Sequence, residues 1–187
     1  MAMMALAVVG QKKLPYKDPS LSVEERVNDL LSRMTLEEKI GQMRCTLAWN
    51  YYEIDGNKVV PSESFKKDIA EGNIGMLWAT YRADPWTQKS LSNGLNPELA
   101  AKAGNALQRY VMEQTRLGIP LFLAEEAPHG HMAIGTTVFP TGLGLAATWS
   151  TEAAEAMGRV VGKEVRLQGG HISYGPVLDL SRDPRWS

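Results

Sequence analysis

Residues 121–140, LFLAEEAPHGHMAIGTTVFP, constrain the fold of this chain more than any other stretch. Four apolar residues run directly into Glu125 and Glu126, and a turn that carries His129 and His131 follows. This order is typical of a buried strand that ends at a working surface. In α/β barrels and open α/β sheets, the loops at the carboxyl ends of parallel strands hold the ligand. We therefore expect these four side chains at the rim of a cleft.

Short apolar runs alternate with helical patterns along the chain, which indicates a parallel α/β architecture. A closed (β/α)8 barrel needs eight strands and typically ~250 residues. The sequence therefore predicts either an open sheet or an incomplete barrel. An inserted hairpin is also expected at 51–60, where Asp55-Gly56 suits a tight turn. The parallel strands are expected at 43–48, 74–78, 121–125 and 172–180.

Polar residues are placed to cap the helices that connect these strands. Ser22 and Thr35 each have a glutamate three residues further on, as a capping box requires. The longest helix is expected to start at Pro97 and to end at Gly118, and the last helix to end at Gly169. Residues 79–96 form a connection long enough to suggest a functional loop. The expected caps are Ser22, Thr35, Asn96 and Ser150.

The charge balance argues against some classes of partner. The net charge is -1 and the pI is about 6.3, so neither nucleic acid nor an anionic membrane is an expected partner. Cys45 is the single cysteine, which excludes an internal disulfide. Its apolar neighbours Met43 and Leu47 favour a packed thiol over a reactive one.

The N-terminus raises the question of export. Residues 2–10, AMMALAVVG, match the length of the apolar part of a signal peptide and fall far short of the ~20 residues that a membrane span needs. A positively charged start is missing. We interpret 1–13 as the remnant of a signal peptide and leader, which predicts a periplasmic or secreted protein. An unstructured N-terminus is the alternative.

The two adjacent glutamates have different expected roles. Successive side chains of a strand point to opposite faces, so one carboxylate should face the cleft and the other should not. Two suitably spaced carboxylates would make a glycosidase, and Glu126 with Asp179 or Asp183 is a candidate pair. The alternative is a structural salt bridge with an arginine such as Arg182 or Arg185.

The histidines and tryptophans allow further interpretations. His129 and His131 could bind a metal together with a carboxylate. However, Pro128 and Gly130 favour a tight turn in which the histidines donate hydrogen bonds, so no metal site is expected. Tryptophans could stack on a sugar face or serve ordinary packing. The candidates are Trp86, Trp149 and Trp186.

Four linked motifs carry a resemblance to a known family. They are MTLEEKIGQM (34–43), RLGIPLFLAEEAPHGH (116–131), TVFPTGLGLAATWS (137–150) and GPVLDLSRDPRWS (175–187). In order and spacing the chain resembles, from about Leu14 to its end, the N-terminal catalytic domain of glycoside hydrolase family 3. The resemblance implies that 14–187 are roughly the first half of a (β/α)8 barrel, which a second α/β sandwich domain follows in the family. It also implies retaining hydrolysis of β-linked terminal sugars, such as β-glucosides or β-xylosides, without metal or cofactor.

The resemblance assigns roles to several positions. Glu126 matches the acidic residue that binds sugar hydroxyls in the nonreducing-end subsite, where many β-glucosidases of the family have aspartate. Because the longer glutamate could crowd a hydroxymethyl group, we expect a tilt toward β-xylosides. His129 and His131 match histidines that shape this loop. Arg182 and Arg185 match the family's RDPRW segment, which supports the cleft.

The family's Lys-His pair, nucleophile and acid/base residue all match positions beyond this chain. We therefore expect no catalytic residue and no measurable glycosidase activity in the 187-residue chain alone. The remaining half of the barrel and the second domain are expected partners. An unpaired edge at 172–180 is expected to favour aggregation. The alternatives are a β-N-acetylhexosaminidase of the same family, a non-catalytic sugar-binding module and a metal hydrolase.

Overall fold

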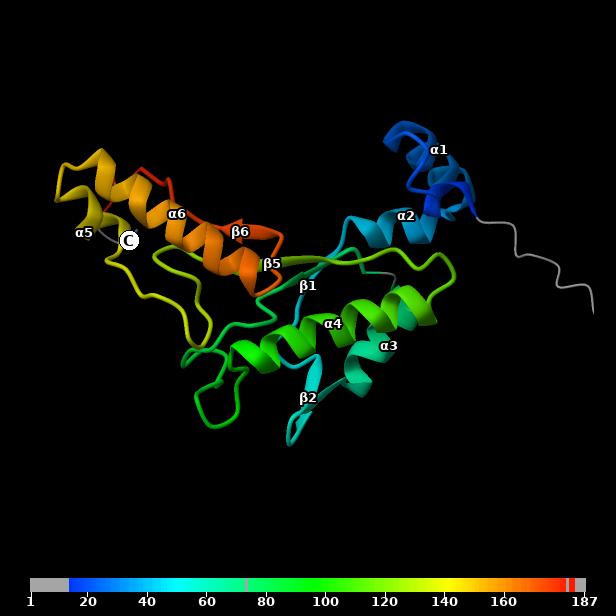
Figure 1. Cartoon of the computed structure of the whole chain (residues 1–187), viewed down its shortest axis with the longest axis horizontal. Coiled ribbons are helices and arrows are strands. Elements are labelled where there is room, and N and C mark those ends of the chain that lie inside the picture. The colour runs from blue at the N-terminus through cyan, green and yellow to red at the C-terminus, as the bar shows by residue number, and fades with distance from the viewer. Residues whose placement is uncertain (1–13, 73, 181, 184–187) are drawn as a thin grey trace, which may run out of the picture. The chain divides into compact units, whose positions relative to one another are not determined.

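The computed structural model describes residues 14–72, 74–180 and 182–183, which form two compact units, one up to Lys39 and one from Ile40 (Figure 1). The expected leader at 1–13 lies outside the described residues. The first unit holds the 3-10 helix η1 (Pro15–Lys17) and the helix α1 (Val23–Arg33), and α2 (Leu36–Gln42) crosses into the second unit.

Both predicted capping boxes of the first unit are confirmed. Ser22 Oγ accepts a hydrogen bond from the Glu25 backbone N–H at 3.2 Å, and Glu25 Oε2 accepts one from the Ser22 N–H at 2.9 Å. Thr35 and Glu38 exchange the same two bonds at 3.2 and 2.9 Å. Each exchange satisfies two N–H groups that have no partner within their helix, which fixes where α1 and α2 begin.

The second unit contains the predicted parallel sheet. Its four strands lie in the order β1-β4-β5-β6, each parallel to its neighbours, and the described residues do not close the sheet into a barrel. The expectation of a partly formed α/β barrel is thereby met. The strands are β1 (Cys45–Leu47), β4 (Met76–Trp78), β5 (Phe122–Glu126) and β6 (Ile172–Tyr174).

The last strand is shorter than predicted. The sequence predicts a strand over 172–180, but β6 ends at Tyr174, whose carbonyl accepts a hydrogen bond from Ala127 N at 3.3 Å. Pro176 has no N–H with which to continue the ladder. Residues 175–180 therefore leave the sheet.

Side chains on one face of the sheet show that the sheet is strongly curved. The Cys45 Sγ on β1 lies 3.9 Å from the Tyr174 hydroxyl on β6, although β4 and β5 lie between these strands. In a flat sheet, strands three places apart would be about 14 Å apart. The face that carries Cys45 and Tyr174 must therefore be concave, as in the wall of a barrel.

In the described part of the second unit, four helices accompany the sheet: α3 (Glu63–Gly72), α4 (Pro97–Gln114), α5 (Gly142–Ala146) and α6 (Thr151–Leu167). The predicted caps Asn96 and Ser150 accept hydrogen bonds from backbone N–H groups in the first turns of α4 and α6, at 2.9 and 3.1 Å. The prediction that α4 runs to Gly118 was wrong. Thr115 turns to an extended conformation and its hydroxyl donates to Val111 O at 2.6 Å, which ends the helix at Gln114.

The hairpin is confirmed as an antiparallel pair, β2 (Tyr52–Asp55) and β3 (Lys58–Pro61), with Gly56 at a φ of 57° in its turn. The main core lies between the sheet and the helices. Leu77 and Leu123 point from β4 and β5 into it and are almost fully buried, as is Phe65 of α3.

The expectation of a packed Cys45 was wrong, because its thiol is exposed. Apolar neighbours suggested burial, but strand alternation places Cys45 and Leu47 together on the concave face, where both side chains are exposed. Thr46, between them, points toward the helices.

Candidate functional site

Glu125 is a structural carboxyl group. Its side chain is fully buried and lies on the helix-facing side of β5. Its Oε1 accepts a hydrogen bond from Thr80 N at 3.0 Å, and Tyr81 N lies 3.4 and 3.3 Å from its two oxygens. Burial raises the pKa of Glu125 to about 8, although the two backbone N–H groups act in the opposite direction. Glu125 thus ties β5 to the turn after β4 and, contrary to the expectation from the sequence, does not lie at the rim of a cleft.

Glu126 lies on the concave face and is arranged differently. Its side chain keeps 19% of its accessible surface, and its Oε1 lies 3.9 Å from Arg82 Nη1. Its side-chain oxygens accept no hydrogen bond from any described residue. A carboxylate that is mostly removed from water and lacks donors is costly unless a ligand supplies them. Glu126 is therefore the open group at the carboxyl end of β5.

Arg82 comes from the loop after β4 and is held by two neighbours. Its Nη2 and Nε lie 2.6 and 2.7 Å from Asp84 Oδ2, and its guanidinium carbon lies 4.6 Å from the centre of the Trp86 ring. Burial acts to raise the pKa of Asp84, but the hydrogen bonds from Thr87 and the ion pair with Arg82 outweigh it, so the pKa lies below its usual value. Asp84 is thus a firm anchor for Arg82.

The loop after β4 is joined to the loop after β5. Ala83 N donates to Met132 O at 2.9 Å, and Met132 N donates to Glu126 O at 2.9 Å. Arg82 and Ala133 also form an antiparallel bridge. These bonds place part of the expected functional connection, residues 79–96, directly beside Glu126.

Aromatic side chains gather around the same place. The Trp86 ring lies 4.7 Å from that of Trp49 and 6.2 Å from that of Trp78, and Trp78 lies 5.8 Å from Tyr174. Trp86 remains 54% exposed. Trp149, another predicted stacking candidate, is 94% exposed and is not part of this group.

The histidines of the 127–133 loop do not share one environment. His131 is 3% exposed, and its ring lies 6.4 Å from that of Tyr81. Burial lowers the pKa of His131, although the Glu126 backbone and Gln168 act to raise it. His129 is half-buried, and its carbonyl accepts a hydrogen bond from Phe139 N at 2.8 Å. Both residues thus support the loop beside Glu126. The described residues contain no group of three His, Cys, Asp or Glu side chains that could hold a metal ion.

The C-terminal arginines are only partly placed. Arg182 is exposed, and its N–H donates to Leu180 O at 2.8 Å, whereas Arg185 and Trp186 lie outside the described residues. The cation that the structure places beside Glu126 is Arg82. The sequence interpretation missed Arg82, Asp84 and Trp49. The available signal was that Arg82 and Asp84 follow the apolar run of β4, as Glu126 follows that of β5.

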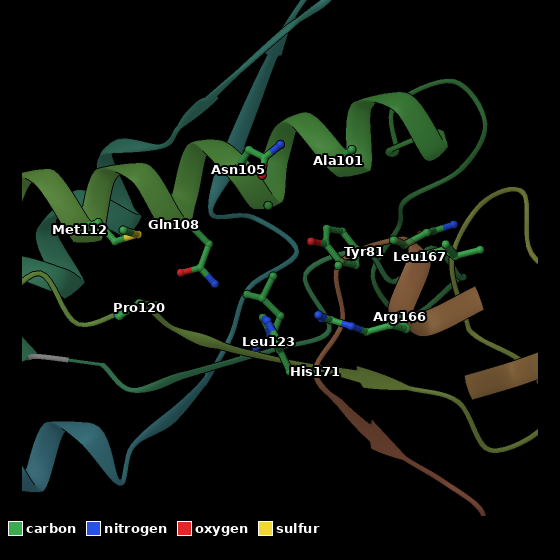
Figure 2. A pocket seen from close by; sticks show the side chains of 13 residues that line it. Tyr81, Ala101, Asn105, Gln108, Met112, Pro120, Leu123, Arg166, Leu167 and His171 are labelled. Atoms are coloured by element: carbon green, nitrogen blue, oxygen red, sulfur yellow. Dashed lines mark hydrogen bonds between the residues drawn. The ribbon is translucent and has the colours of Figure 1, made fainter. Parts of the chain in front are cut away.

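A cavity of about 500 Å³ lies between α4, the end of α6 and the start of β5. Figure 2 shows Gln108 pointing from α4 toward β5 and Arg166 reaching toward Leu123. Leu123 lines this cavity and points to the opposite face of β5 from Glu126. The cavity is therefore separate from the cluster around Glu126.

The chain is similar in sequence to known glycosidases. The chain is 37% identical to a putative β-xylosidase of Formosa agariphila, over 91% of this chain and 21% of that protein. It is 34% identical to a periplasmic β-glucosidase of Salmonella typhimurium, over 86% of this chain and 17% of that protein. The chain thus spans about a fifth of the length of these relatives.

Solved structures agree at the level of the fold. A β-glucosidase from Erythrobacter marinus is 29% identical and superposes with a TM-score of 0.68, covering 94% of this chain and 21% of that chain. A β-glucosidase from Listeria innocua, solved in complex with isofagomine, is 30% identical with a TM-score of 0.60, over 87% of this chain and 19% of that chain. None of the described helices is long and apolar enough to cross a membrane.

The sequence model described as "Glycosyl hydrolase family 3 N terminal domain" matches residues 35–187. This range includes the whole curved sheet, with Arg82 and Glu126 at the carboxyl ends of its strands. The chain therefore belongs to glycosyl hydrolase family 3 through its N-terminal domain.

Proposed function

We propose that this chain supplies the glycone-binding part of a retaining, exo-acting β-glycosidase that hydrolyses terminal β-linked glucose or xylose. The observation that carries this proposal is the open carboxylate of Glu126 beside Arg82, at the carboxyl ends of β5 and β4. Substrates bind at this edge of the sheet in α/β barrels. The names of the relatives, a β-xylosidase and a β-glucosidase, support the substrate class.

The contrast between Glu125 and Glu126 assigns binding to one of them. The oxygens of Glu125 already accept backbone hydrogen bonds in a fully buried position, so a sugar cannot reach them. The oxygens of Glu126 lie on the concave face, where they can each accept a hydrogen bond from a sugar hydroxyl. Glu126 therefore binds hydroxyl groups of the glycone, with His129 and His131 supporting the loop around it.

Bond cleavage is a different task. Retaining hydrolysis needs two carboxyl groups about 5 to 5.5 Å apart on either side of the scissile bond. At the ends of β4 and β5, Glu125 is buried and Asp84 is bound to Arg82, so Glu126 is the open carboxylate there, and Asp179 lies exposed in the segment after β6. We therefore expect the 187-residue chain alone to bind glycosides without turnover above blank.

Titration of the chain with methyl β-D-xylopyranoside and methyl β-D-glucopyranoside, followed by NMR, tests the binding role. We expect saturable binding that Glu126→Gln weakens roughly 10-fold or more, because hydrogen bonds to a charged group contribute about 1.5–3 kcal/mol. Glu155→Gln, at an exposed site on α6, is the matched control and should bind as the wild type does. No saturable binding by the wild type, or equal binding by Glu126→Gln, would refute the proposal. Tighter binding of the methyl glycoside of N-acetylglucosamine would favour the hexosaminidase alternative instead.

We also propose that the protein is exported to the periplasm or beyond. Two relatives are named as periplasmic enzymes, and residues 2–10 have the length and composition of the apolar part of a signal peptide. Mass analysis of the N-terminus of the protein recovered from outside the cytoplasm tests this proposal. A mature protein that still carries Met1 would contradict it.

A further inference from the structure

Arg82 is held as rigidly as a binding residue has to be. Its Nε and Nη2 both bind Asp84 Oδ2, and its guanidinium lies over the Trp86 ring. Its side chain is only 15% exposed. A guanidinium that is fixed on one edge by a carboxylate and on one face by an aromatic ring loses little further freedom when a ligand binds. The remaining nitrogen, Nη1, lies nearest to Glu126.

The distance between Arg82 and Glu126 leaves room for a third group. Nη1 and Oε1 are 3.9 Å apart, which is too far for a direct hydrogen bond. An oxygen atom placed ~2.8 Å from both would form two good hydrogen bonds. Arg82 can only donate and a carboxylate can only accept, so the inserted group must accept from one and donate to the other. A hydroxyl group does both.

We infer that Arg82 is a second ligand-contacting residue of the glycone site, and that its Nη1 shares one sugar hydroxyl with Glu126. This inference rests on the proposed function, since it assumes that a glycoside binds at Glu126. Asp84 and Trp86 then act as positioning residues, because they hold Arg82 without touching the shared hydroxyl.

The charges of this cluster also select a class of sugar. Arg82 brings one positive charge, and Asp84 and Glu126 bring two negative charges. An anionic sugar would meet net repulsion in a partly buried site, where charge interactions are strong. The site therefore takes a neutral glycone and disfavours a uronic acid.

Deoxygenated sugars test the shared hydroxyl. The chain is titrated with methyl β-D-xylopyranoside and with its 2-, 3- and 4-deoxy analogues. We expect the wild type to bind one analogue roughly 10-fold or more weaker than the others, since the loss leaves a charged donor and a charged acceptor without a partner. In Arg82→Met, the affinity for the parent glycoside should fall, and the ratio of that affinity to the affinity for the weakened analogue should become smaller. This ratio is the penalty for the analogue. Asp84→Asn, which loosens Arg82, should weaken binding but keep the same order among the analogues.

Two controls separate a specific effect from general damage. Arg159→Met removes an exposed arginine of α6 that also pairs with a carboxylate, and it should leave every affinity unchanged. Arg82→Lys keeps the positive charge but loses the planar guanidinium. The loss of affinity for the same deoxy analogue, relative to the parent glycoside, should therefore be smaller than in the wild type but still measurable. The readout is a ratio of two affinities measured on one variant, so a variant with a reduced folded fraction still gives an answer.

The outcomes distinguish the two proposals. If no glycoside binds the wild type, the proposed function itself fails. If Glu126→Gln weakens binding while Arg82→Met and Arg82→Lys keep the full penalty for the same analogue, the role of Arg82 is overturned and that of Glu126 stands. Binding of methyl β-D-glucuronide as tight as that of the glucoside would overturn the inferred preference for a neutral sugar.

Discussion

Glu125 and Glu126 are adjacent on β5, yet their side chains lie on opposite faces of the sheet and meet opposite surroundings. Glu125 is fully buried and accepts hydrogen bonds from the Thr80 and Tyr81 backbone. Glu126 faces Arg82 across 3.9 Å on the concave side. Strand alternation thus places a structural carboxyl group directly behind the carboxylate that we propose binds the ligand. Disturbing Glu125 should therefore change the stability of the fold and the position of the loop that carries Arg82.

The first prediction concerns the pH dependence of stability. Burial raises the pKa of Glu125 from 4.5 to about 8, so the folded state binds a proton more tightly than the unfolded state does. Between these two pH values the free energy of unfolding should fall as the pH rises, because the folded state must give up that proton. Since one pKa unit corresponds to about 1.4 kcal/mol, we expect Glu125 to contribute a fall of at least ~2 kcal/mol between pH 5 and pH 8.

Glu125→Gln is the matched variant, because an amide keeps an oxygen acceptor for the Thr80 and Tyr81 N–H groups and has no proton to lose. Urea unfolding of both proteins at several pH values gives the difference in their unfolding free energies. Burial lowers the pKa of His131, so this residue adds to the free energy of unfolding as the pH rises toward the usual histidine pKa. That contribution should be nearly the same in both proteins and should therefore largely cancel in the difference. A difference that stays constant with pH would show that Glu125 does not titrate in this window.

Sequence patterns predicted the parts of the fold that depend on local order. The apolar run that ends at Glu126 predicted β5, and Asn96 predicted the start of α4, because alternation and capping act over a few residues. Exposure of Cys45 could not be read in the same way, since it depends on which face of β1 the helices cover. The sequence showed apolar neighbours, and only the assembled sheet shows that they share the open concave face.

Only one of the two loops that form the candidate site was predicted from the sequence. Glu126 stood out because it follows an apolar run and precedes a turn. Arg82 and Asp84 lie in a loop without periodicity, and their approach to Glu126 depends on the register in which Trp78 of β4 pairs with Ala124 of β5. No local pattern in the sequence determines that register.

A second prediction concerns the packing of α4 on the loop after β4. A Cβ added to Gly104 would lie 2.3 Å from the hydroxyl oxygen of Tyr81, a side chain that is 1% exposed and would have to shift from its packed position. Gly104→Ala should therefore lower the free energy of unfolding by about 1–3 kcal/mol. Gly158→Ala in α6 is the control, since nothing lies within 4 Å of its added Cβ, and it should raise stability by up to ~1 kcal/mol. Equal effects of the two substitutions in urea unfolding would contradict this packing.

A third prediction follows from the uncovered concave face. Phe122 is 59% exposed there and Leu47 is 43% exposed, in rows of apolar side chains that run across the strands. Exposed apolar patches favour association. We therefore expect the 187-residue chain to self-associate in sedimentation velocity experiments, and Phe122→Ser to reduce the associated fraction several-fold. Leu91→Ser removes an apolar side chain that is 89% exposed in the 79–96 loop, and it should leave the association unchanged. A wild-type chain that sediments as a monomer at high concentration would contradict the prediction.

The last prediction concerns the sugar that Glu126 admits. Glu126 is one methylene longer than an aspartate at this position would be, so its carboxylate is expected to reach further toward the glycone. Arg82, fixed on Asp84 and Trp86, limits how far Glu126 can retreat on that side. A glucoside must fit its hydroxymethyl group into the remaining space, whereas a xyloside has no hydroxymethyl group to fit. We therefore expect the chain to bind methyl β-D-xylopyranoside roughly 10-fold tighter than the glucoside, since a hydroxymethyl group is larger than the single methylene that contributes about 1–3 kcal/mol to discrimination. Glu126→Asp shortens the side chain and keeps the charge, so it should narrow or reverse this ratio in the same titration. A wild type that prefers the glucoside would show that the space beside Glu126 is set by other groups, and a ratio unchanged by Glu126→Asp would show that the length of this side chain does not set the preference.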